Sequence, residues 1–164
     1  MIEFYIGTDT STKSICLGTL EKFGKKVDSN WYWQGLGGDN LFDKMDEAYN
    51  FTSSWIEYMY QKVHPALENI VVGIEEPVYI QNGKTHKALC CIYASVVKAF
   101  MDSKLTPQSV NISTWKKIVI GKGNANKQVV KEKMIEILSL PDDLDQDVYD
   151  ALGIACYVWK GGDK

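Results

Sequence analysis

The chain of 164 residues contains no arginine, so all 18 of its basic residues are lysines, and its net charge is -3. Arginine supplies the planar fork that reads guanine through two hydrogen bonds in the major groove of DNA. Its absence argues against recognition of base edges. Lysine binds phosphate as a point charge, so any contact with a nucleic acid should depend mainly on backbone charge and shape.

Zinc-binding patterns and long apolar runs are also missing. The cysteines form no CxxC pair and no histidines stand at zinc spacing, so we expect neither a metal knuckle nor a disulfide framework. We expect all four to be small buried apolar residues. No apolar run reaches membrane-spanning length, and the N-terminal MIEFYIGTDT starts with strand-like sequence instead of a signal core. These features predict no membrane partner and a cytoplasmic location. The four cysteines are Cys16, Cys90, Cys91 and Cys156.

Size and composition are those of an ordinary globular protein, and we expect one compact domain over residues 1–164. The charges are segregated along the sequence. Residues 116–133 hold six lysines and one glutamate, whereas residues 142–150 hold five aspartates. This segregation predicts a basic surface beside an acidic pocket, which the small net charge conceals.

Hydrophobic periodicity predicts an α/β protein that begins with three β elements. The segment 69–74 is almost entirely apolar, which is typical of a parallel strand covered on both faces. The rest of the order, helix, strand, helix, strand, helix and helix, fits a mixed sheet with helical crossovers. The predicted elements are strands over 2–8 and 14–20, a strand containing Trp31 and Trp33, a helix over 41–63, a strand over 69–74, a helix over 84–103, a strand over 110–112, a helix containing Val130 and Leu138, and a helix over 147–159.

Four carboxylates stand at positions where α/β proteins collect functional groups. Asp9 follows the first predicted strand, and Glu75 follows the predicted strand over 69–74. If these two strands are neighbours, both side chains emerge at the same edge of the sheet. Asp147 and Asp150 are three residues apart at the start of a predicted helix, so they share one helical face.

Such a cluster has a definite chemical meaning. Four nearby carboxylates repel one another and need a cation to remain ionised together. Mg²⁺ prefers oxygen ligands, and two such ions can activate a water and stabilise the departing oxygen in phosphodiester hydrolysis. Three of the acids also have a simpler explanation: Asp9 as a turn residue, Asp147 as a first-turn acid favoured by the helix dipole, and Asp150 as a surface residue. Glu75 differs, because a charged residue that closes an apolar buried strand is costly without a partner.

Three stretches of the sequence resemble RuvC-type Holliday-junction resolvases. The longest is STWKKIVIGKGNANKQVVKEKMIEILSLPDDLDQDVYDALGIA, with a lysine, a glycine loop, a second lysine, a helix ending in Leu-Pro, and an Asp-x-x-Asp-Ala-Leu-x-x-Ala helix. VVGIEEPVYIQNGK resembles the strand that ends in glutamate, followed by an aromatic residue. IGTDTSTKSICLGTL resembles the first strand and hairpin. The family's Gly-x-Asp-Pro-Gly reads Gly-Thr-Asp-Thr-Ser here, so we expect a different first turn.

The resemblance implies roles for nine residues. Asp9, Glu75, Asp147 and Asp150 match the family's catalytic acids and metal ligands. Lys116 and Lys127 match two lysines near the DNA strand that is cut, with the adjacent Lys117 as an alternative for the inner role, and Tyr79 matches an aromatic that stacks on bases at the junction. The residues implied to bind DNA are Lys116, Lys117, Lys122, Lys127 and Tyr79.

The resemblance also implies a fold and a function. The fold is RNase H-like, with a five-stranded mixed sheet in the order 3-2-1-4-5 flanked by helices. The expected activity is metal-dependent endonucleolytic cleavage of Holliday junctions and other branched DNA, in recombination and repair, with two Mg²⁺ ions that Mn²⁺ can replace. A C₂ homodimer is expected, since a symmetric junction needs two related cuts, with the helix over 84–103 at its interface. We expect a bacteriophage source, and hence the host cytoplasm as the location.

The sequence suggests three alternatives to a resolvase. The segment GTDTSTKS also looks like the phosphate-binding hairpin of sugar kinases, but those proteins need two such domains and 164 residues supply one. The glycine loop around Lys122 gives little support for nucleotide binding, because the GxxxxGK[ST] pattern is absent. An RNA-processing nuclease resembling YqgF has the same fold. A non-catalytic protein that binds branched DNA is the third alternative.

Overall fold

A computed structural model describes residues 2–63 and 67–162. Its centre is a five-stranded sheet in the order β3-β2-β1-β4-β5, which confirms the order expected from the sequence. β1 pairs antiparallel with β2, and β2 with β3, whereas β1–β4 and β4–β5 are parallel pairs. The strands are β1 (Ile2–Thr10), β2 (Ser14–Phe23), β3 (Lys26–Gly35), β4 (Ile70–Glu75) and β5 (Gln108–Val110).

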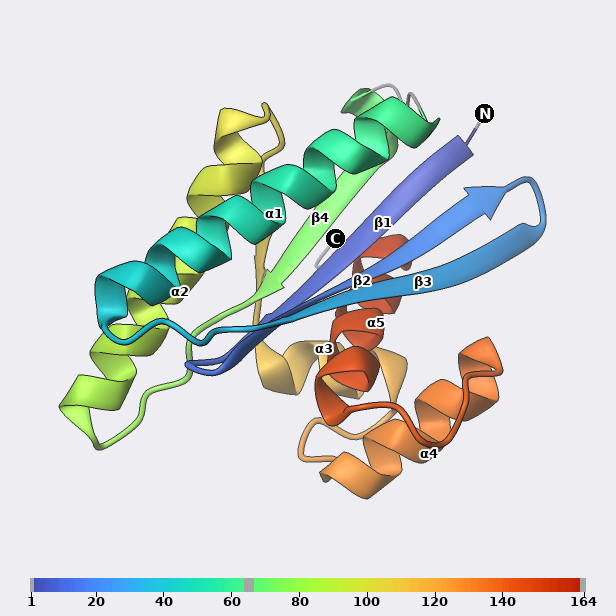
Figure 1. Ribbon diagram of the computed structural model, residues 1–164. Coiled ribbons are helices and arrows are strands. Elements are labelled where there is room, and N and C mark those ends of the chain that lie inside the picture. Colours follow the sequence, from blue (N-terminus) through green and yellow to red (C-terminus); the bar gives the residue numbers. More distant parts are fainter. Residues whose placement is uncertain (1, 64–66, 163–164) are drawn as a thin grey trace.

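Helices cover both faces of the sheet (Figure 1). α1 and α2 lie on one face, and α3, α4 and α5 lie on the other. A short 3₁₀ helix, η1 (Leu67–Asn69), precedes β4. None of the helices in the described ranges is both long enough and apolar enough to cross a membrane. The helices are α1 (Leu41–Val63), α2 (Gly83–Asp102), α3 (Ile112–Val119), α4 (Lys127–Leu138) and α5 (Gln146–Trp159).

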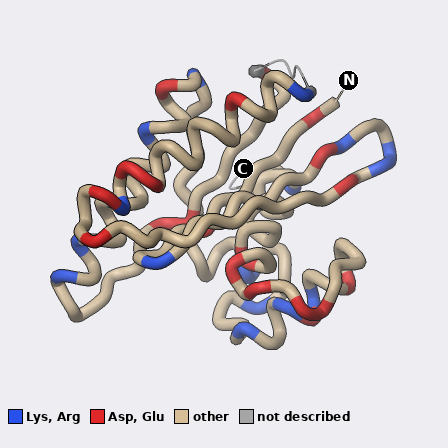
Figure 2. Tube along the Cα trace, in the orientation of Figure 1, with Lys and Arg blue, Asp and Glu red and all other residues tan. Residues whose placement is uncertain are grey.

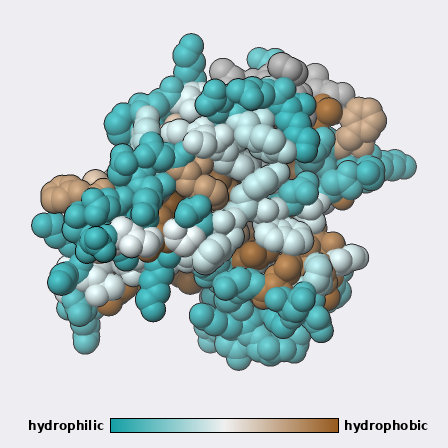
Figure 3. Space-filling model, in the orientation of Figure 1, coloured by the Kyte–Doolittle hydropathy of each residue, from teal (hydrophilic) through white to brown (hydrophobic). Residues whose placement is uncertain are grey.

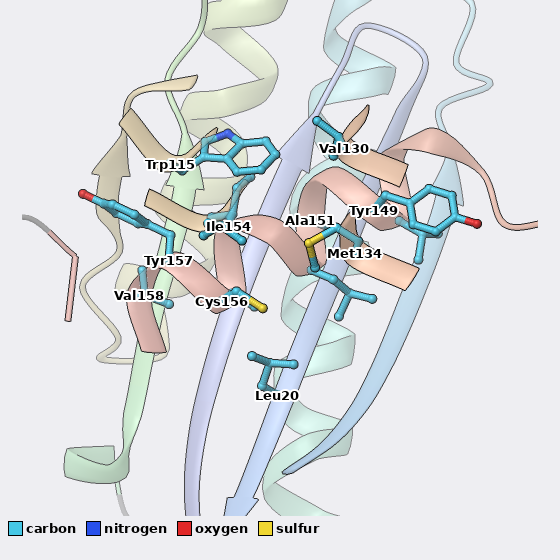
Figure 4. Close-up of a cluster of buried hydrophobic side chains, with 14 of the residues drawn as sticks. Leu20, Trp115, Val130, Met134, Tyr149, Ala151, Ile154, Cys156, Tyr157 and Val158 are labelled. Atoms are coloured by element: carbon cyan, nitrogen blue, oxygen red, sulfur yellow. The ribbon is translucent and has the colours of Figure 1, made fainter. Parts of the chain in front are cut away.

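Each face of the sheet has its own apolar core. Large side chains such as Ile6, Val72 and Phe100 fill the space beneath α1 and α2. The opposite core is built around α5, of which ten residues are buried, and the fully buried Trp115 of α3 packs against it (Figure 4). Because both faces of β4 are covered, its sequence is almost continuously apolar, as predicted.

One predicted element needs correction and one helix was not predicted. The strand expected over 110–112 lies at Gln108–Val110, and Ile112–Val119 form α3, which the hydrophobic periodicity did not indicate. α3 is short and contains several β-branched residues, which have low intrinsic helix propensity. Its stability comes from burial of Trp115 and from Asn111, whose side chain caps the helix by accepting from the Ser113 N–H.

The cysteine prediction is half right. Cys16 and Cys156 are buried in the core around α5, whereas Cys90 and Cys91 on α2 are only partly buried. α2 is a surface helix, so one side of the helix is covered by the rest of the protein and the other side faces solvent. Cys90 instead lies 3.7 Å from Nε2 of His86, one turn earlier on the same helix.

Candidate active site

Asp9 and Glu75 extend from neighbouring parallel strands on the same face of the sheet. Gly7 of β1 is paired with Gly73 of β4. Side chains alternate between faces along a strand, so the acids two residues beyond these glycines point to the same side. Asp9 is the penultimate residue of β1, not the residue after it as predicted, and Glu75 is the last residue of β4.

Glycines on this face allow α5 to lie directly against the sheet. A Cβ atom on Gly7 would overlap the backbone of Ala151 and Ala155, and one on Gly18 would lie 2.7 Å from the Leu152 nitrogen. Without these Cβ atoms, backbone meets backbone between helix and strands. The first turn of α5 is therefore held next to the ends of β1 and β4.

The first turn of α5 brings in the remaining two acids. The side chain of Asp145 caps the helix by accepting a hydrogen bond from the Asp147 N–H at 3.1 Å. Asp147 and Asp150 are one turn apart, and both influence the pKa of Asp9. The structure thus brings together all four acids predicted from the sequence.

Ser14, which the sequence analysis missed, holds Asp147. Its hydroxyl donates to Oδ2 of Asp147 at 2.6 Å, from the first residue of β2. Ser11 in the preceding turn accepts from the backbone N–H groups of Lys13 and Ser14, and its hydroxyl lies 2.9 Å from that of Ser14. The polar turn that replaces the family's Pro-Gly is therefore part of the site. In the sequence, the two serines of Ser-Thr-Lys-Ser were the pattern from which the role of Ser14 could have been predicted.

Trp115 holds Glu75 and was also missed. Its indole N–H donates to Oε2 of Glu75 at 2.7 Å. The ring lies against α5 beside Ile154 (Figure 4), where Gly153 leaves room, since a Cβ there would approach the ring to 2.6 Å. The side chain is 0% exposed, so this hydrogen bond is shielded from water. The only indication of this role in the sequence was a tryptophan that directly precedes Lys116 in an otherwise polar segment.

Burial and mutual repulsion raise the pKa values of three acids. Burial raises the pKa of Asp9 well above its usual value, and the charges of Glu75, Asp150 and Asp147 raise it further. Burial also raises the pKa of Glu75 to about 7, although the hydrogen bond from Trp115 opposes this. For Asp150 burial is again the largest cause, partly offset by nearby lysines. Coupling of this kind is typical of carboxylates gathered at a functional site.

The side chains as they stand are not arranged around a single point. Within residues 2–63 and 67–162, no three acidic, histidine or cysteine side chains form a group ready to hold a metal ion. Each of three acids directs an oxygen toward a protein donor, which accounts for their separation: Glu75 toward Trp115, Asp147 toward Ser14, and Asp150 toward Nε2 of Gln146. Their other carboxylate oxygens are the donor type that Mg²⁺ and Mn²⁺ take.

The predicted DNA-binding lysines fall into two groups. Lys116 and Lys127 are close enough to the acids to lower carboxyl pKa values: Lys116 acts on Glu75, Lys127 on Asp9, and both on Asp150. Lys116 also extends over the ring of Trp115, at 5.5 Å from its centroid. Lys117, Lys122 and Lys127 are exposed, whereas Lys116 is half-buried, and neither Lys117 nor Lys122 is among the groups that lower these pKa values. Of the adjacent lysines on α3, Lys116 therefore has the inner position.

Tyr79 lies in the loop between β4 and α2, four residues after Glu75. Its side chain is 81% exposed. Its ring contacts that of His86, with centroids 5.4 Å apart, and Nδ1 of His86 lies 3.2 Å from the carbonyl oxygen of Val78. An exposed aromatic on a loop beside the acids has the chemistry needed to stack on a base.

Comparisons with known proteins identify relatives along almost the whole chain. The family model for crossover junction endodeoxyribonuclease RuvC matches residues 37–157, a range that includes Glu75, Asp147 and Asp150 but begins after Asp9. The RuvC protein of Cupriavidus pinatubonensis is 26% identical over 161 residues, covering 96% of this chain and 84% of the relative. That of Ralstonia pickettii is 24% identical over 160 residues, with the same coverage.

Solved structures show the same fold. T. thermophilus RuvC in complex with Holliday junction substrate superposes with a TM-score of 0.77 at 17% identity, covering 97% of this chain and 96% of that one. The yeast mitochondrial Holliday junction resolvase gives a TM-score of 0.56 at 16% identity, covering 92% and 75%. These matches support the α/β fold with a five-stranded mixed sheet that was expected from the sequence. Since the family model covers well over half of the residues, the chain belongs to the RuvC family of crossover junction endodeoxyribonucleases.

Proposed function

We propose that this protein is a structure-selective endonuclease that cuts Holliday junctions and other branched DNA by metal-dependent hydrolysis. The observation that carries the proposal is the placement of four carboxylates from β1, β4 and α5 at one end of the sheet, near enough to influence the pKa of Asp9, beside the inner lysine of α3. Membership of the RuvC family supports the same activity. The cleavage would leave a 5′ phosphate and a 3′ hydroxyl.

The residues of the site divide into groups with different tasks. Asp9, Glu75, Asp147 and Asp150 would hold two divalent cations, Mg²⁺ or Mn²⁺, which supply an activated water and stabilise developing charge when bound. Trp115 and Ser14 fix the orientation of two of these ligands. Lys116 and Lys127 hold the phosphate of the DNA strand through their positive charge, with Lys117 and Lys122 contacting backbone further out.

Two cuts on opposite strands require two active sites. A C₂ homodimer provides them, and we propose that the protein acts in this form, with α2 at the interface. Exposed apolar side chains on α1 and α2 support this location: Phe42 is 78% exposed and Met101 is 59% exposed. We place the activity in the cytoplasm. A bacteriophage source stays a prediction from the sequence.

Cleavage of a panel of substrates tests the function. End-labelled four-way junctions, Y-forms, linear duplex and RNA/DNA hybrid are incubated with Mg²⁺, Mn²⁺ or EDTA. We expect paired cuts in the junction with either metal and none in EDTA. Equal cutting of linear duplex would contradict structure selectivity. Equal cutting of the RNA/DNA hybrid would contradict the proposal and favour a YqgF-like RNA-processing role. Junction binding without any cleavage would indicate the non-catalytic alternative.

A matched pair of substitutions tests the acid cluster. Asp147→Asn should abolish cleavage while junction binding persists, because the amide cannot replace the anionic ligand. Asp143→Asn removes the same charge from an exposed residue four positions earlier and should cleave like the wild type. Full activity of the Asp147 variant would remove that residue from the site.

Light scattering of the wild type measures the oligomeric state, and a monomer that makes paired cuts would refute the dimer.

A further inference from the structure

A groove lies beside the acidic site on the other face of the sheet. Three segments line it: the turn between β1 and β2, the start of α1 with the residues before it, and the first turns of α2. Each segment contributes one lysine, namely Lys13, Lys44 and Lys84, and Asp39 is the acid among the lining residues. None of the three lysines was assigned a role from the sequence.

The three ammonium groups are free of carboxylate partners. Among the described residues, no acidic oxygen lies within 4.0 Å of their Nζ atoms, whereas Lys22, Lys26, Lys98 and Lys133 each form such an ion pair. Lys13 and Lys84 are exposed. Lys44 is half-buried and donates to the carbonyl oxygen of Thr12 at 3.0 Å, so its charge is held within the groove. The lining residues therefore carry three positive charges and one negative charge, with none of the lysines in a direct ion pair.

The groove begins one residue from the acid cluster. Lys13 directly precedes Ser14, whose hydroxyl binds Asp147. Lys116 and Lys127 lie on the opposite side of the acids, on α3 and at the start of α4. Figure 2 shows basic positions near the starts of α1 and α2 and along α3 and α4, with acidic positions interspersed at the start of α1. Hydrophilic side chains cover most of the corresponding surface (Figure 3). The acids thus have lysines on both sides, those of the groove on one and those of α3 and α4 on the other.

We propose that this groove, lined by Lys13, Lys44 and Lys84, binds backbone phosphates of the branched DNA substrate as its strand leaves the acid cluster. The proposal rests on the proposed function. A strand running over four carboxylates needs compensating cations on both sides of the cut, and the lysines near α3 supply only one side. We assign DNA backbone phosphate as the ligand because the groove adjoins the turn that holds Asp147, where a strand cut at the acids must pass. Lysine point charges suit sequence-independent phosphate contacts.

The salt dependence of binding measures these contacts directly. In EDTA, the affinity for a four-way junction is measured from 50 to 200 mM NaCl for the wild type and for Lys13→Gln/Lys44→Gln/Lys84→Gln. Each phosphate contact contributes about 0.9 to the slope of log affinity against log salt. We expect the slope to fall by about 2 to 3 in the triple variant. The matched control is Lys25→Gln/Lys62→Gln/Lys104→Gln, which removes the same charge from the opposite end of the sheet and should keep the wild-type slope.

The outcomes separate failure of the groove from failure of the function. An unchanged slope in the triple variant, or an equal fall in the control, overturns the groove as a DNA site even if the wild type resolves junctions. A wild type that does not bind junctions overturns both proposals. Sodium phosphate should compete no better than sodium chloride at equal ionic strength. If it displaces DNA from the wild type but not from the triple variant, the groove is a small-anion site instead.

Footprinting gives a second, positional measurement. Hydroxyl-radical protection of the junction should extend to both sides of the cut for the wild type. In the triple variant, protection should be lost on one side only, with the other side retained by Lys116 and Lys127. Uniform loss on both sides would indicate a general folding or charge effect and would refute the assignment, as would unchanged protection.

Discussion

The two faces of the sheet differ in what lies between helix and strand. Under α1 and α2, large side chains such as Ile6 and Ile92 fill the gap, and none of the four acids lies there. Under α5, Gly7 and Gly18 leave no gap to fill, and the acids lie at one end of this contact. A layer of side chains can repack, whereas two backbones in contact fix the spacing between their layers. The acids lie on the face where position is most tightly defined.

Gly7→Ala should have the largest effect, because it attacks the backbone contact itself. The new methyl group would overlap the backbone of α5, which cannot yield as a flexible side chain does. We expect a loss of about 3 kcal/mol or more in the free energy of unfolding. Urea unfolding followed by tryptophan fluorescence measures it, and a loss below about 1 kcal/mol would contradict the close contact.

Stability against pH tests the buried charge on the same face. The pKa of Glu75 is raised to about 7 in the folded protein, so the folded state binds its proton more tightly than the unfolded state. Its contribution to stability is therefore complete below about pH 4.5 and is lost as the pH rises through 7. In EDTA the loss attributable to this group between pH 4.5 and 8 is about 3 kcal/mol.

The control for this prediction is Glu75→Gln, in which that loss should be absent. Asp9 and Asp150, whose pKa values are also raised, add to the loss in the wild type and remain in the variant. Mg²⁺ at pH 8 should restore stability to the wild type, since it favours the ionised carboxylates. Identical pH profiles for the two proteins would show that Glu75 is not buried as described.

Trp115→Phe tests orientation while an aromatic ring stays in the buried position. It removes the hydrogen bond to Glu75, and hydrogen bonds to charged groups contribute about 1.5–3 kcal/mol. If that energy positions the carboxylate for catalysis, single-turnover cleavage should slow by about tenfold to hundredfold. Trp159→Phe, at the far end of α5, should leave the rate unchanged. Equal rates for the two variants would assign Trp115 a packing role alone.

The smallest effect is expected on the opposite face. Ile92 is fully buried beneath α2, so Ile92→Val removes one methyl group from side-chain packing. We expect a loss of about 1 kcal/mol in the free energy of unfolding and no change in the cleavage rate. A clear fall in cleavage at preserved stability would show that both faces control the site.

Periodicity and strand-end chemistry were sufficient for the sheet and most helices. β4 was recognisable because burial on both faces demands an apolar run, and α1 because its apolar positions recur over 23 residues. α3 could not be recognised in this way. Its eight residues allow only two turns, and Trp115, which makes it stable, is buried by residues of α5 that are distant in the sequence.

The candidate site was predictable in its acids and not in their anchors. Asp9, Glu75, Asp147 and Asp150 are charged residues at element ends, where sequence patterns can select them. Ser14 and Trp115 act on them across 133 and 40 residues of sequence. Hydrogen bonds of this kind depend on the distance between layers of the fold, which no local pattern encodes.

The glycine contact under α5 has a consequence for how such proteins diverge. Side-chain cores change shape whenever their residues are exchanged, and a site that rests on them must be readjusted each time. Here Asp147 and Asp150 are positioned by contacts between main-chain atoms, and the main chain has the same shape whatever side chains surround it. Most of the sequence can therefore vary, as the 17% identity to T. thermophilus RuvC illustrates. The spacing of the acids depends on the few positions, such as Gly7 and Gly18, where only glycine fits.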